Sequence, residues 1–111
     1  KNLLTTEKVL EERIKEYVRI KEESREPFAM LELALKTLSL ARLVANDVGE
    51  EIIMDAHCRV SEAYLLGGMN TQAMQHAYEA VSKAKHMKRE PSHKVLMCLG
   101  RAFMATGNLK R

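Results

Sequence analysis

The sequence predicts an all-α protein built from antiparallel helical hairpins, and three features support this fold class. The run that begins Val60-Ser61-Glu62-Ala63-Tyr64 is echoed 39 positions later by Leu99-Gly100-Arg101-Ala102-Phe103, with apolar, small, charged, Ala and aromatic residues in the same order. The 111 residues include only two prolines and five glycines, most of which lie at short breaks between helix-periodic stretches. The apolar content of 46% suits one globular domain. A repeat of this length is typical of stacked helical hairpins.

Two helices are expected before the first copy of this pattern. The first runs from about Thr6 to Glu23, with Thr5 or Thr6 as its N-terminal cap. Its apolar stripe consists of Leu10, Ile14, Tyr17 and Val18. The segment Ser24–Pro27 breaks it, because proline disfavours helical geometry in the preceding residue. The second helix runs from Pro27 to about Ala45 and is apolar almost all round, which predicts that it is covered on more than one side.

Three further helices are expected at residues 50–66, 71–87 and 91–106, and a sixth begins at Leu109 and is cut off. The fourth carries a row of small residues that lets a neighbouring helix approach closely: Ala73, Ala77, Ala80 and Ala84. All of the connections are short, so successive helices should be antiparallel neighbours. No strand, linker or low-complexity segment is expected.

The repeated residues resemble those of the tetratricopeptide repeat, a helical hairpin with small and aromatic residues at set positions. The matching residues, which we expect to pack the repeats together, are Ser61, Tyr64, Ala73, Ala80, Gly100 and Phe103. This resemblance implies a right-handed α-solenoid. The period exceeds the usual 34 residues, as in the long-period repeats similar to kinesin light chains and cell-polarity adaptors. His57, Ala77 and Lys85 depart from the pattern, and another α-solenoid is the alternative.

On this reading residues 1–111 form a single helical-repeat domain and a fragment of a longer array. Residues 6–46 form a degenerate repeat, residues 50–87 a full repeat and residues 91–111 a partial one. The resemblance implies that the first helix of each hairpin lines a concave groove for a protein partner, such as an acidic peptide or a neighbouring subunit. The partner groove would consist of Asp55, Cys58, Glu62, Lys94, Met97 and Arg101.

The sequence offers no pattern for catalysis, a metal or a cofactor. The four histidines form no zinc-type spacing with each other or with cysteine, and we expect them to be solvated or hydrogen-bonded. His93 near Cys98 has neither an elbow motif nor an orienting carboxylate. Cys58 and Cys98 form no CxxC pair, so reduced, partly buried thiols are expected. The protein is therefore predicted not to be an enzyme, and no run is long enough to span a membrane.

The net charge of +3 is unevenly distributed, because residues 71–111 carry eight basic and two acidic side chains, a balance of +6. A basic surface for an acidic partner is expected from Lys83, Lys85, Lys88 and Arg89. We therefore expect a protein-interaction scaffold or adaptor, which the resemblance places in the cytoplasm and associates with the cytoskeleton or a cilium. Nucleic-acid binding is a second hypothesis, disfavoured because no aromatic residue is interleaved for stacking. A sensor segment of a larger enzyme is a third.

Overall fold

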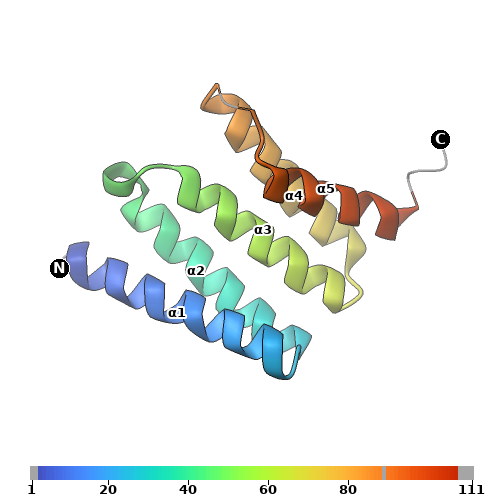
Figure 1. Ribbon diagram of the computed structural model, residues 1–111, viewed down its shortest axis with the longest axis horizontal. Helices are drawn as coiled ribbons and strands as arrows, with labels where there is room; N and C mark the ends of the chain where they lie inside the picture. Colours follow the sequence, from blue (N-terminus) through green and yellow to red (C-terminus); the bar gives the residue numbers. More distant parts are fainter. Residues whose placement is uncertain (1–2, 89, 108–111) are drawn as a thin grey trace.

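The computed structural model describes residues 3–88 and 90–107, which form five α-helices and no β-strand (Figure 1). The helices are α1 (Leu3–Glu23), α2 (Pro27–Val48), α3 (Glu51–Leu66), α4 (Asn70–His86) and α5 (His93–Thr106). The turns between them are short, so each helix runs antiparallel to the one before it. Among these helices none is long and apolar enough to cross a membrane. The all-α prediction is therefore confirmed.

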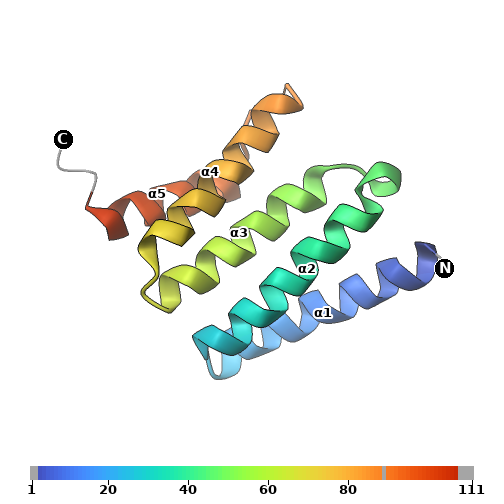
Figure 2. The same ribbon diagram turned by 180° about the vertical axis from the view of Figure 1, so that it is seen from behind.

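The helices are arranged in two layers. Helices α1, α3 and α5 face the viewer in Figure 1, whereas α2 and α4 face the viewer from the opposite side in Figure 2. The shortest extent of the molecule is 18 Å, which has room for two helix layers but not for three. Helix α3 lies at the centre, where it contacts α2, α4 and α5.

Local sequence explains where α2 and α5 begin and end. The side chain of Glu26 accepts a hydrogen bond from the Ala29 N–H at 3.0 Å, and Pro27 occupies the first helical position. Ser92 caps α5 in the same way, accepting from the Val95 N–H at 3.3 Å. Helix α5 ends at Gly107, whose φ of 77° is a left-handed conformation that glycine adopts without strain.

Two predicted boundaries differ from the structure by three residues, and the other predicted helix ends lie within two residues of the observed ones. Helix α1 begins at Leu3, so Thr5 and Thr6 lie within its first turns rather than capping it. Helix α2 continues to Val48, three residues past the predicted end, because Gly49, with a φ of 104°, is the first residue to leave helical geometry. The predicted sixth helix, from Leu109, lies outside the described residues.

Two apolar clusters hold the layers together, one on each side of α3. The first joins α1, α2 and α3 and contains Tyr17, Met30, Ala34, Leu38, Ala41, Ala45, Ile53, Ala56, Val60 and Ala63. The second joins α3, α4 and α5 and contains Met54, Cys58, Met74, Ala77, Ala80, Ala84, Val95, Cys98 and Ala102. Helix α2 is covered by α1 and α3, as its composition predicts. Its outer face nevertheless leaves Phe28 and Leu43 exposed.

Candidate functional site

The residues expected to pack the repeats together lie mostly in the interface between α3 and α4. Ser61 is fully buried, and its hydroxyl donates to the carbonyl oxygen of Ala73 at 2.8 Å. Ala73 and Ala80 are fully buried, as is the rest of the alanine row of α4, which confirms that this row admits a close neighbour. Tyr64 stacks on His76 with ring centroids 5.7 Å apart. A small hydroxyl and small side chains thus let the two helices approach closely.

The equivalent positions on α5 behave differently. Phe103 packs edge-on against Tyr78 of α4, with ring centroids 5.8 Å apart. Gly100, by contrast, is exposed, and a Cβ built there would meet nothing within 4 Å. The helix expected to pack against Gly100, the one that begins at Leu109, lies outside the described residues, so this expectation stays a prediction.

The acidic residues assigned to the groove already have partners on the protein. Glu62 accepts a hydrogen bond from the Tyr17 hydroxyl at 2.6 Å and pairs with Lys21 at 2.7 Å, so its carboxylate is engaged by α1. Burial and this bond raise the pKa of Tyr17 above its usual range. Asp55 lies 3.9 Å from Lys94, which joins the acidic and basic sides of the groove directly.

The other three groove residues divide into buried and exposed ones. Cys58 is buried and lies against Cys98 of α5, a neighbour that the sequence did not predict. Met97 and Arg101 are exposed, and Met104 continues their line one turn further along α5. Together with Lys94 these residues follow the helical spacing of three, four and three positions, so they share one face of α5. We call Lys94, Met97, Arg101 and Met104 the α5 stripe.

The predicted basic surface is only partly available. Lys83 pairs with Glu50 at 3.3 Å and is partly buried. Lys85 and Lys88 are exposed. Arg89 lies outside the described residues.

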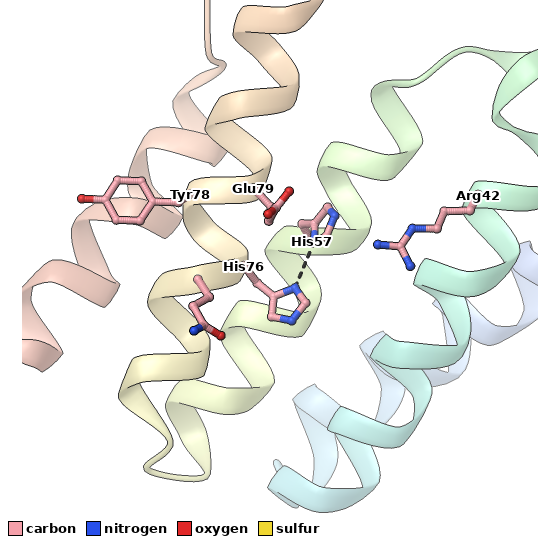
Figure 3. A pocket seen from close by; sticks show the side chains of 6 residues that line it. Arg42, His57, His76, Tyr78 and Glu79 are labelled. Atoms are coloured by element: carbon pink, nitrogen blue, oxygen red, sulfur yellow. Dashed lines mark hydrogen bonds between the residues drawn. The ribbon is translucent and has the colours of Figure 1, made fainter.

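A histidine pair that the sequence did not reveal lies between α3 and α4, in a surface hollow of about 560 Å³ (Figure 3). The Nδ1 atoms of His57 and His76 are 3.0 Å apart, so one ring donates its Nδ1 proton to the other. Figure 3 shows Arg42 of α2 reaching toward the pair and Glu79 beside it, while Tyr78 points away. His57 is only 4% exposed. The pair therefore joins the two helices of one hairpin through neutral imidazoles.

Burial is the main reason why both imidazoles stay neutral. It lowers the pKa of His57 to about 4, helped by the neighbouring His76, Arg42 and Lys83. It also lowers the pKa of His76, whereas Glu79 acts in the opposite direction. Protonating both rings would place two positive charges about one hydrogen bond apart, which the buried site opposes.

The register of the hairpin could have revealed this pair. In an antiparallel hairpin, residues whose numbers have nearly the same sum face each other. Ser61 contacts Ala73, a sum of 134, and His57 contacts His76, a sum of 133. The sequence analysis compared residues along single helices and so passed over His76.

Within the described part of the chain, no group of three or more His, Cys, Asp or Glu side chains could hold a metal ion. The buried side-chain nitrogen and oxygen atoms described there all have hydrogen-bond partners. Comparison with known proteins found no matching family model, no matching curated protein and no matching solved structure.

Proposed function

We propose that this chain is a non-enzymatic interaction module, a segment of a tetratricopeptide-like, right-handed helical-hairpin solenoid that scaffolds a larger assembly. The layer of α1, α3 and α5 over α2 and α4 supports this proposal (Figures 1 and 2). So does the packing of Ser61 against Ala73. The proposed setting is the cytoplasm, with cytoskeletal or ciliary association, as the resemblance implies.

The observation that carries the proposal is the α5 stripe. The exposed fractions are 40% for Met97 and 66% for Met104, and the Lys94 side chain is 66% exposed. Arg101 lies exposed between the two methionines. Helix α5 contains no acidic residue. An exposed face that alternates cations with large apolar side chains fits a peptide that alternates carboxylates with apolar side chains.

The ion pair between Lys94 and Asp55 does not prevent this binding. Its atoms are 3.9 Å apart and both side chains are well exposed, so it contributes about 0–1 kcal/mol. A peptide carboxylate can therefore displace Asp55 at little cost. Arg101 can hold a second carboxylate through two parallel hydrogen bonds. The flexible methionines adapt to the apolar side chain between them.

A display library of random 12-residue peptides, selected on the immobilised chain, tests the proposal. We expect the selected peptides to be rich in Asp and Glu around an apolar residue. Their affinity, measured by fluorescence polarisation, should fall as salt is raised. Selected peptides without acidic residues would contradict the proposal, as would binding of generic RNA that is stronger than binding of any peptide.

The double variant Lys94→Glu/Arg101→Glu should lose at least about tenfold in affinity for the selected peptides, because two favourable charges become repulsive. The matched control is Lys8→Glu/Lys15→Glu, which makes the same change in net charge at two exposed positions on α1. The control should bind nearly as well as the parent. Equal losses in both variants would mean that only net charge matters, and would reject the α5 stripe as the site.

A further inference from the structure

The second cluster brings together two thiols that lie 40 residues apart in the chain. Cys58 projects from α3 and Cys98 from α5, with exposed fractions of 7% and 8%. The Cys98 thiol donates to the carbonyl oxygen of Cys58, with the Cys98 Sγ 4.0 Å from that oxygen, and both residues belong to the second cluster. They are the only cysteines in the sequence. From this juxtaposition we propose that Cys58 and Cys98 form a reversible disulfide, a peroxide-responsive site that locks α5 to α3.

The surroundings assign different roles to the two thiols. The neighbouring Cys58 thiol lowers the pKa of Cys98 despite its burial, and Ser61 and Arg101 act in the same direction. The same contact, together with burial, raises the pKa of Cys58. Cys98 is therefore the attacking thiolate, and Cys58 is the resolving thiol.

A hydroperoxide supplies the oxidising equivalents. The Cys98 thiolate attacks one peroxide oxygen, the O–O bond breaks, and the departing oxygen leaves as water or an alcohol after taking up a proton. Cys98 is then a sulfenic acid. The Cys58 sulfur attacks the Cys98 sulfur, the S–O bond breaks, and the hydroxyl group leaves as water with the Cys58 proton. In total two thiols lose two electrons and two protons, and the peroxide is reduced.

The bond would act on the element that carries the α5 stripe. A link between Cys58 and Cys98 closes a loop that contains all of α4, so α3 and α5 could no longer separate at this point. Cross-linking a loop of this length restricts the unfolded chain strongly. The proposed disulfide rests on the positions of the two thiols and goes beyond the proposed peptide binding.

The first test treats the folded chain with one equivalent of hydrogen peroxide and digests it with trypsin under non-reducing conditions. We expect a loss of about 2 Da, because two hydrogens leave. We also expect a linked pair of peptides, residues 43–59 and 95–101, which reducing agent separates. The melting temperature should rise by about 10 °C on oxidation and return on reduction. Two free thiols after this treatment, or a link between two chains, would overturn the proposal.

Two matched variants test the roles of the thiols. In Cys58→Ser, Cys98 should stop at the sulfenic acid, which a dimedone probe captures. In Cys98→Ser, Cys58 should react at least about tenfold more slowly, because it remains protonated and buried. Equal rates in the two variants would overturn the assignment of Cys98 as the attacking thiol. The peptide map of the parent requires neither variant to fold, and circular dichroism confirms which of them do.

Discussion

The two apolar clusters that flank α3 differ in the side chains that they contain besides alanine. The first cluster, toward α1 and α2, uses large side chains such as Tyr17, Met30 and Leu38. The second, toward α4 and α5, has a similar share of alanines, but the two cysteines and the smaller Val95 stand beside its methionines. On the first side the Tyr17 hydroxyl is held by a hydrogen bond that it donates to the Glu62 carboxylate at 2.6 Å. The second side contains the groups whose state can change, two thiols and two imidazoles. The two sides therefore differ in their polar and thiol groups rather than in their share of small side chains.

The largest effect is expected from removing a large side chain on the first side. Met30→Ala should lower the free energy of unfolding by about 3–4 kcal/mol, because a fully buried side chain leaves a cavity. The matched control is Met104→Ala on α5, where the methionine is 66% exposed and little should change. Urea unfolding followed by circular dichroism gives both values. If both variants lost the same free energy of unfolding, the inference that burial of Met30 stabilises the first cluster would be contradicted.

The second effect is a loss of stability on acidification that depends on the histidine pair. An unfolded histidine binds a proton near pH 6.5, whereas His57 in the folded chain does so only near pH 4. Between pH 4 and 6.5 the unfolded state binds more protons than the folded state. The stability that comes from keeping His57 neutral in the folded chain is therefore complete above pH 6.5 and is lost as the pH falls to 4. The contribution is roughly 3 kcal/mol.

The variant His57→Gln isolates this contribution from that of the acidic side chains. Its free energy of unfolding should fall less steeply than that of the parent between pH 6.5 and 4. Urea titrations at several pH values in this window measure both slopes. If the two slopes coincide, burial of His57 contributes nothing to the pH dependence.

The third effect is a loss of stability when a small buried side chain of the second cluster is replaced by a larger one. Ala80→Leu should cost about 2 kcal/mol, because a fully buried alanine has no space for three more carbons. Ala105→Leu on the exposed face of α5 is the matched control and should be close to neutral. Thermal unfolding of both variants shows the difference. A stabilised Ala80→Leu variant would mean that the second side contains unfilled space.

The smallest effect concerns the hydrogen bond between α1 and α3. Tyr17→Phe should cost about 1 kcal/mol, since Glu62 loses one donor and keeps Lys21. Tyr78→Phe, at a ring that is 49% exposed, is the control. A loss as large as that of Met30→Ala would show that the contact matters more than the packing around it.

The sequence predicted the parts of the fold that depend on local chemistry. The start of α2 and both ends of α5 could be placed from the sequence, because the residues that define them act on the adjoining backbone. These residues are Pro27, Ser92 and Gly107. The alanine row of α4 was found because four small residues share one helical face. The start of α1 was missed, because Thr5 and Thr6 are plausible caps in isolation and the helix simply continues past them.

The sites were less predictable because they depend on register between helices. Which residue of α3 faces which residue of α5 depends on the angle and offset of two helices, so the contact between Cys58 and Cys98 is not visible in either helix alone. The partners of Glu62 come from α1, whose role in lining this surface the repeat pattern did not reveal. The α5 stripe was predictable because it lies on one face of one helix.

The most direct test of the proposed function is a titration of the isotope-labelled chain with a selected acidic peptide, followed by two-dimensional amide NMR. We expect the largest shifts at the amides of residues 94–104 and smaller ones on the adjoining part of α3. The shifts should be lost in Lys94→Glu/Arg101→Glu and kept in Lys8→Glu/Lys15→Glu. Shifts confined to α1 or α2, or shifts that persist in the α5 variant, would show that the partner binds elsewhere.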